Sequence, residues 1–139
     1  MKRPTRLFYL MLVLLIPFVI SCLPDDELGP DTGDPRDKFI GSWNFNETPA
    51  ARGFSYPVNI TYDENNSSRV YLSNLARAGS NYLAYGIVTA NKITVPYQET
   101  APGFFVEGSG TMSTADAMDW VYSYSAGGDT ESFTAYATK

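Results

Sequence analysis

The chain has 139 residues, of which ten are Lys or Arg and fifteen are Asp or Glu, with one cysteine and no histidine. This composition excludes a Ser-His-Asp or Cys-His hydrolase, a His/Cys zinc site and a disulfide within one chain. The acidic balance argues against nucleic acid as a partner, because such binding needs a concentrated basic patch. We therefore expect no catalytic residues, no metal site and no cofactor.

The first residues have the layout of an export signal. Three basic residues precede an uncharged apolar run from Leu7 to Ile20. A membrane-spanning helix needs about 20 apolar residues, so this run is short for one, and Pro17 would disturb such a helix. A signal peptide over residues 1–21 is therefore predicted.

The signal ends in the order Val19-Ile20-Ser21-Cys22. This order resembles the lipobox of bacterial lipoproteins. The resemblance implies that Cys22 is linked to diacylglycerol, becomes the first mature residue and is acylated on its amino group. Three acyl chains, at ~0.8 kcal/mol per buried methylene, would anchor the protein stably in a membrane. Plain secretion, with Cys22 incidental, is the alternative.

Residues 22–38 are rich in proline, glycine and acidic side chains, which predicts an extended tether. The acidic stretch Leu23–Glu27 resembles the export signal that sends Bacteroidetes lipoproteins to the outer face of the outer membrane. The resemblance implies an outer-membrane protein that is exposed at the cell surface. A solvated acidic spacer is the alternative for this stretch.

From residue 39 onward, apolar and polar residues alternate with the period of two expected of strands with one buried face. Turn-forming residues separate the alternating runs, and residues 74–77 suit a short helical turn. Eight strands are predicted, over residues 39–46, 54–62, 69–75, 82–89, 92–98, 104–112, 118–124 and 131–138.

Strands joined by local turns, without a long helical pattern, make residues 39–139 an all-β domain. A closed, eight-stranded up-and-down barrel is predicted because closure leaves no open sheet edge. A two-sheet β-sandwich would satisfy the same alternation.

Gly41-Ser42-Trp43, on the first predicted strand, resembles the Gly-x-Trp element that opens the barrel in lipocalins and the wider calycin group. Together with residues 36–40, the hairpin at 91–96 and the closing strand at 133–137, it is similar to small lipocalin-like lipoproteins of Bacteroidetes. The resemblance implies that Trp43 packs at the floor of a barrel.

The chain departs from this pattern at its carboxyl end. Typical lipocalins continue into a helix and supply a late basic residue that packs over the tryptophan, whereas this chain ends on a strand at Lys139. A smaller, plainer barrel is therefore expected.

Trp120, Tyr122 and Tyr124 alternate on one predicted strand, so their side chains share a face. If that face points inward, they would line a small cavity with Tyr56 and Tyr62. Aromatic rings line apolar pockets and stack on sugar faces. We expect a monomer that binds a small apolar or amphipathic ligand in the barrel without catalysis, unless these rings simply fill the barrel.

A surface interaction module is the alternative function. It would contact glycan or protein through loops such as 76–81 and 99–103, and it predicts that Tyr71, Phe105 and Tyr136 point outward. The run Asp63–Asn66 offers oxygens that calcium could use, but it lacks the spacing of an EF-hand loop and is interpreted as a solvated turn.

Overall fold

The computed structural model describes residues 33–48 and 54–139. The predicted signal peptide, the predicted lipid attachment at Cys22 and most of the predicted tether lie outside the described residues. Within the two described ranges, no helix is long and apolar enough to cross a membrane.

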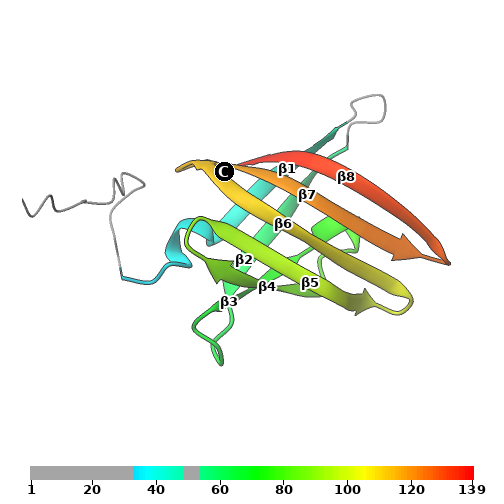
Figure 1. Ribbon diagram of the computed structural model, residues 1–139, viewed down its shortest axis with the longest axis horizontal. Helices are drawn as coiled ribbons and strands as arrows, with labels where there is room; N and C mark the ends of the chain where they lie inside the picture. Colours follow the sequence, from blue (N-terminus) through cyan, green and yellow to red (C-terminus); the bar gives the residue numbers. More distant parts are fainter. Residues whose placement is uncertain (1–32, 49–53) are drawn as a thin grey trace, which may run out of the picture.

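The described chain forms one closed sheet of eight antiparallel strands (Figure 1). Each strand pairs with the next along the chain, and β8 returns to pair with β1. The strands are β1 (Gly41–Thr48), β2 (Ser55–Tyr62), β3 (Arg69–Ser73), β4 (Leu83–Thr89), β5 (Lys92–Ala101), β6 (Phe104–Thr114), β7 (Ala117–Ala126) and β8 (Asp129–Thr138). The predicted all-β up-and-down barrel is confirmed, and the sandwich alternative is wrong.

The predicted alternation decides which side chains enter the barrel. On β1, Trp43, Phe45 and Glu47 are buried, whereas Asn44 and Asn46 are exposed. Successive side chains of a strand point to opposite faces, so every second residue of each strand faces the interior. The inward set is apolar except near one end of the barrel, where it includes the carboxylate of Glu47.

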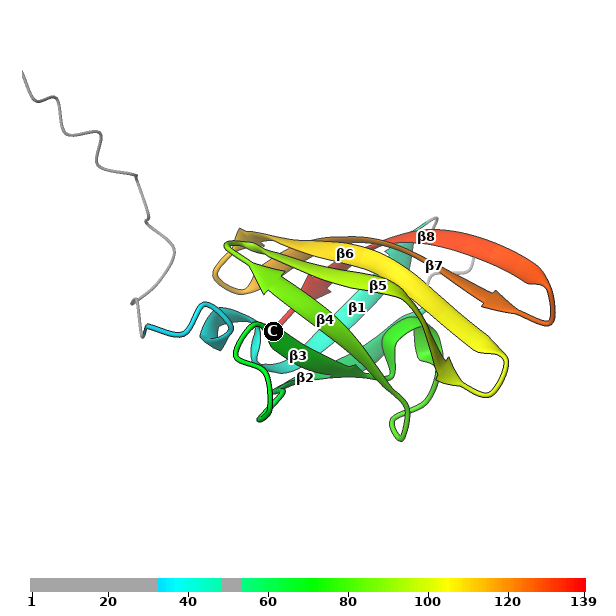
Figure 2. The ribbon, with the colours of Figure 1, turned by 60° about the horizontal axis from the view of Figure 1, so that its bottom comes forward.

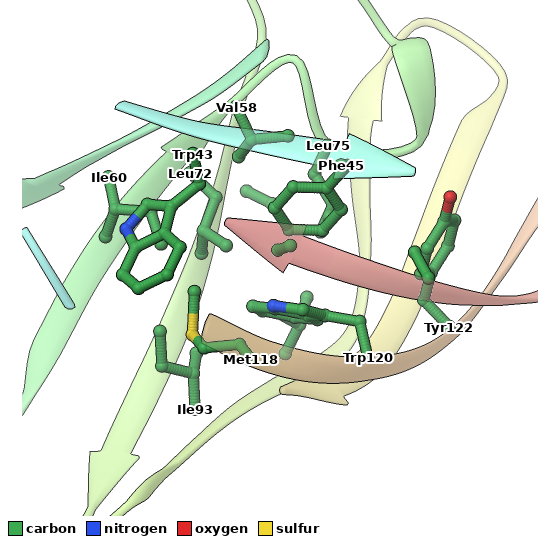
Figure 3. Close-up of a cluster of buried hydrophobic side chains, with 14 of the residues drawn as sticks. Trp43, Phe45, Val58, Ile60, Leu72, Leu75, Ile93, Met118, Trp120 and Tyr122 are labelled. Carbon is green, nitrogen blue, oxygen red and sulfur yellow. The ribbon is translucent and has the colours of Figure 1, made fainter. Parts of the chain in front are cut away.

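Large side chains fill the middle of the barrel (Figure 3). Trp43 and Phe45 are fully buried and Trp120 is 1% exposed. The ring centroids of Phe45 and Trp120 lie 5.2 Å apart, at a tilted angle typical of aromatic pairs in a core. This part of the interior therefore serves packing.

Gly110 on β6 makes room for the indole of Trp120 on β7. The two residues are opposite each other, and a β-carbon on Gly110 would lie 2.1 Å from the Trp120 ring. At Gly108, a β-carbon would lie 2.6 Å from the carbonyl oxygen of Val121. Both glycines thus permit a close approach, and at Gly110 the approaching group is a side chain rather than backbone.

We call one end of the barrel the closed end. It comprises the turns at residues 63–68, 90–91 and 115–116 and a 3₁₀ turn, η1 (Asp37–Phe39), that precedes β1. Phe39 is fully buried beneath the barrel, and its carbonyl oxygen accepts a hydrogen bond of 2.7 Å from Nε1 of Trp43. Trp43 therefore packs at the floor of the barrel.

Lys139 also closes this end. Its Nζ lies 4.9 Å from the Trp43 ring centroid and donates to the carbonyl oxygen of Lys38 at 3.0 Å. The expected departure from the lipocalin pattern is therefore wrong in this respect, because a late basic residue does lie over the tryptophan. The alternation of the last strand gave no sign that this terminal side chain folds back.

We call the opposite end the mouth. Strands β5 to β8 are 10 or 11 residues long, whereas β1 to β4 have 5 to 8 residues. Among the described residues, the pairing of β1 with β8 runs from Asn44 to Thr48, opposite Thr134, and the first part of β8 extends past it. In Figure 2, the β5–β6 and β7–β8 hairpins reach beyond the other strands. We call the inner face of β6, β7 and β8 at this end the ledge.

A second 3₁₀ turn, η3 (Leu75–Arg77), lies between β3 and β4 and covers part of the mouth. Leu75 and Ala76 are each 2% exposed, so the turn packs onto the core. The side chain of Asn74 fixes the turn, since its Nδ2 donates to the carbonyl oxygen of Pro57 at 2.8 Å and its Oδ1 accepts from the amide of Gly79 at 3.0 Å. The turn lies within residues 74–77, whose sequence suits a short helical turn, but Ala76 and Arg77 have left-handed backbone angles.

Candidate functional site

Four aromatic rings form a row on the inner face of the mouth: Phe104, Tyr124, Phe133 and Tyr122. Successive ring centroids along this row lie 5.0, 5.7 and 5.8 Å apart, and the ring planes are within 16°, 4° and 24° of parallel. Tyr122 is buried, while the other three rings are partly exposed. The row therefore runs from the solvent-facing ledge into the barrel.

Sheet geometry builds this row. Tyr122 is opposite Phe133 across β7 and β8, and Tyr124 is opposite Val106 across β6 and β7. Directly opposed side chains of an antiparallel pair stand about 5 Å apart, which brings Tyr122 and Phe133 together. Tyr124 stacks on Phe104 and Phe133, its diagonal neighbours, which aromatic side chains are long enough to reach. The predicted shared face of Trp120, Tyr122 and Tyr124 points inward, but Trp120 belongs to the filled middle and not to the row.

A buried polar cluster lies at the inner end of the row. The hydroxyl of Tyr122 donates to Oε1 of Glu47, and the hydroxyl oxygens of Tyr56 and Tyr122 are 2.7 Å apart. Because Tyr122 has a single hydroxyl proton, Tyr56 is the donor in the second bond. Burial raises the pKa of both tyrosines above the ordinary value, so both hydroxyls stay protonated at neutral pH.

Arg77 completes the cluster. Its Nε lies 3.5 Å from Oε1 of Glu47, and its Cζ lies 4.4 Å from the ring centroid of Phe54 and 5.8 Å from that of Phe133. The guanidinium is thus placed between two aromatic rings, an arrangement favoured by cation–π attraction. It links η3 to the end of the aromatic row.

Two polar atoms of this cluster have no hydrogen-bond partner among the described residues. They are Oε2 of Glu47, whose side chain is 3% exposed, and Nε of Arg77. A buried polar atom without a partner costs about 1–3 kcal/mol, and such atoms are rare in folded proteins. The mouth therefore holds hydrogen-bonding capacity that the fold leaves unused.

The backbone that presents Arg77 is strained. Asn74, Ala76 and Arg77 have φ values of 64°, 53° and 61°, in the left-handed region that residues other than glycine seldom adopt. Each such residue costs about 1 kcal/mol or more, and strain of this kind concentrates at ligand-binding sites. Asn74 and the buried Leu75 and Ala76 hold the turn in this conformation.

Tyr62 does not join the other predicted ligand residues. Its hydroxyl donates to Oδ1 of Asp37, and the guanidinium carbon of Arg36 lies 4.8 Å from its ring centroid. These contacts place Tyr62 at the closed end, at the far end of β2 from Tyr56. The cavity predicted from the sequence therefore combined Tyr56 and Tyr62, which lie at opposite ends of β2.

Sequence reasoning missed several residues of the site: Glu47, Phe54, Arg77, Phe104 and Phe133. One signal was available for Glu47, because it continues the inward series Trp43, Phe45 and therefore places a charge on an apolar face. The first strand was predicted to end at residue 46, so this charge was assigned to a loop. Nothing in the local pattern marked Arg77.

The turn Asp63–Asn66, which has oxygens that calcium could use, binds the guanidinium of Arg36 instead. Nη1 of Arg36 donates to the carbonyl oxygens of Asp63, Asn66 and Arg69 at 3.1, 3.0 and 3.2 Å. Asp63 is 1% exposed and accepts hydrogen bonds from Nε and Nη2 of Arg69 at 2.9 and 2.7 Å. The described residues contain no group of three or more His, Cys, Asp or Glu side chains that could hold a metal ion.

The outer wall carries a second aromatic feature. Tyr97 and Phe105 stack with centroids 5.3 Å apart, and Tyr97 is 60% exposed. Tyr136 is 48% exposed on β8. An open groove of about 480 Å³ lies over β5, β6 and β7, and its lining includes Thr94, Ser109 and Pro96, which precedes Tyr97 in the chain.

No family model matches the sequence, and no curated protein matches it. Among solved structures, the chain is similar to that of EF1p2_mFAP2b bound to DFHBI, with 10% sequence identity and a TM-score of 0.47. The similarity covers 76% of this chain and 97% of the other chain.

Proposed function

We propose that the protein binds a small, flat, amphipathic molecule at the mouth of its barrel, as a monomer and without catalysis. The observation that carries this proposal is the row of four near-parallel rings, three of which are partly exposed on the ledge. Aromatic faces of this kind take flat apolar bodies, and a few polar groups beside them fix orientation. Those polar groups are Glu47, Tyr56 and Arg77.

The filled middle of the barrel limits how deep such a ligand can lie. Trp43, Phe45 and Trp120 occupy that region, so the ligand would rest on the ledge above them. Sites of this type need apolar walls and only a small number of polar contacts. At the mouth, the apolar wall comes from β6, β7 and β8, and the polar groups come from β1, β2 and η3.

We further propose that lipid on Cys22 anchors the protein in the outer membrane of a bacterium and that the protein is exposed at the cell surface. The apolar run before Cys22, the lipobox order and the acidic stretch after it support this location. Growth of a bacterial host with an alkyne-bearing fatty acid should label the protein but not the Cys22→Ala variant. Equal labelling of both would contradict the proposed anchor.

Binding at the ledge is tested with N-phenyl-1-naphthylamine, a neutral flat probe whose fluorescence rises in apolar sites. Phe133→Ala removes a ring that stacks on both Tyr122 and Tyr124, so we expect an affinity about tenfold lower, a loss of about 1.4 kcal/mol. Tyr97→Ala removes a stacked ring on the outer wall and serves as the matched control. Equal effects of the two substitutions would contradict a site at the mouth.

A second candidate function is contact with glycan through the outer wall. The stacked pair Tyr97 and Phe105 beside the open groove favours it, because exposed rings pack on sugar faces. Glycan-array binding that is lost in Tyr97→Ala and kept in Phe133→Ala would support this candidate. An array without signal above background would remove it.

A further inference from the structure

We infer that the polar end of the ligand is anionic and that Arg77 binds it. This inference rests on the proposed binding at the mouth and specifies the chemical class of the ligand. Arg77 lies beside Phe133, within the aromatic row, and its side chain is 32% exposed although its Nε is buried. The exposed atoms therefore belong to the rest of the side chain, which includes the Nη end of the guanidinium.

The distribution of basic side chains singles out Arg77. At the closed end, Arg36 pairs with Asp34, Arg69 pairs with Asp63, Lys38 donates to Asn91 and Lys139 packs on Trp43, while Lys92 begins β5 at the same end. Among the described residues, Arg77 is thus the basic side chain that the mouth presents. An anion approaching the ledge meets its charge at the inner end of the row.

Glu47 orients Arg77 without using its hydrogen-bonding capacity. The distance of 3.5 Å from Nε to Oε1 is long for a hydrogen bond, and Oε1 already accepts from the hydroxyl of Tyr122. A guanidinium forms its strongest contacts as short, paired hydrogen bonds to carboxylate, sulfonate or phosphate oxygens. The ion pair with Glu47 leaves these contacts to a ligand.

The other acidic side chain near the row lies farther out. Glu131 is exposed and accepts a hydrogen bond of 2.8 Å from the hydroxyl of Tyr124. Glu131 stands opposite Tyr124. It lies on β8 two residues before Phe133, nearer the turn between β7 and β8. An amphipathic anion would therefore place its charged group at Arg77 and its flat body over Phe133 and Tyr124.

The test uses two probes that share one ring system. N-phenyl-1-naphthylamine is neutral, and 1-anilinonaphthalene-8-sulfonate carries a sulfonate on the same rings. We expect the protein to bind the sulfonate about tenfold more tightly, because charge-assisted hydrogen bonds are roughly twice as strong as neutral ones. Equal affinities would overturn the inference but leave the proposed function standing, whereas failure to bind either probe would defeat both.

Arg77→Gln should lower the ratio of the two affinities, sulfonate over neutral probe, from about ten to about one. Lys92→Gln removes the same charge from the closed end and should change neither affinity. A preference that persists in Arg77→Gln, or that disappears in Lys92→Gln, would overturn the inference. Binding of the neutral probe reports that the mouth of each variant is intact.

Glu47→Gln provides a test of opposite sign that does not depend on how well Arg77→Gln folds. Glutamine keeps the shape of the side chain and an oxygen for Tyr122, but it removes the negative charge that faces Arg77. The ratio of the sulfonate affinity to the neutral-probe affinity should then rise several-fold above that of the wild type. An unchanged or lower ratio in Glu47→Gln would overturn the inference.

Discussion

The closed end and the mouth of the barrel differ in how their buried polar groups are hydrogen-bonded. At the closed end, the indole nitrogen of Trp43 donates to Phe39, and Nη1 of Arg36 reaches three backbone carbonyl oxygens. At the mouth, Glu47 and Arg77 each retain a buried polar atom without a hydrogen-bond partner among the described residues. One end uses its polar groups to hold the fold, and the other keeps some of them available.

The backbone shows the same contrast. Of the four described non-glycine residues with positive φ, three lie in the 74–77 segment at the mouth, and the fourth, Ala90, lies in the tight turn between β4 and β5. Strained turns and unpaired polar groups are tolerated where function needs them and are compensated by packing elsewhere. The comparison supports the proposed division, in which the closed end provides stability and the mouth provides recognition.

The largest effect on stability is expected from Trp43→Ala. Trp43 is fully buried, and removal of a large aromatic side chain from a core costs about 3–5 kcal/mol of unfolding free energy. Urea denaturation of this variant against wild type and Phe133→Ala measures the difference. Phe133 is partly exposed, so its removal should cost about 1–2 kcal/mol. Similar losses in the two variants would break the proposed division between the ends.

The same arginine substitution made at each end should give different results. Arg36→Gln leaves the carbonyl oxygens of Asp63, Asn66 and Arg69 without their donor, and we expect a loss of about 2–3 kcal/mol. Arg77→Gln takes the counter-charge from the buried carboxylate of Glu47 but leaves its hydrogen bond from Tyr122, so we expect a smaller loss of about 1–2 kcal/mol. Thermal melts would contradict the comparison if Arg77→Gln were the less stable variant.

A third effect is expected from alkaline pH, and its largest part arises at the mouth. Burial raises the pKa of Tyr56 and Tyr122 above the ordinary value of 10.0, so only the unfolded chain ionises these hydroxyls just above that pH. The folded state then binds more protons than the unfolded state, and stability falls as pH rises above about 10.

The decline should reach about 1.4 kcal/mol per pH unit for each of the two tyrosines. Tyr56→Phe removes one of them and should make the fall less steep, as measured by urea denaturation between pH 8 and 11. An unchanged slope in Tyr56→Phe would show that its hydroxyl is not the group that titrates.

Much of the barrel could be predicted because alternation is a local property. Each strand has one buried face, so the alternation of apolar and polar residues is enough to predict that Phe45 is buried and Asn46 is exposed. The limits of the elements were less accurate. Phe39 continues the alternation of β1 but belongs to η1, where a turn buries it beneath the barrel. Strand β5 extends to Ala101, past the predicted break, through two irregularities in its pairing with β6.

The site depended on information that alternation does not carry. Tyr56 and Tyr62 lie on the same face of β2, but Tyr56 is at the mouth and Tyr62 is at the closed end. Arg77 reaches the site through a left-handed turn, and Glu47 and Tyr122 meet only because β8 closes on β1. Contacts across the closed sheet decide which predicted residues act together.

One measurement tests the division between the two ends most directly: amide chemical shifts of the isotopically labelled protein during titration with N-phenyl-1-naphthylamine. We predict that the largest changes occur at Arg77, Phe104, Tyr124 and Phe133. The turn at 63–68 and the indole of Trp43 should remain unchanged. Changes centred on the closed end, or on Tyr97 at the outer wall, would contradict a ligand site at the mouth.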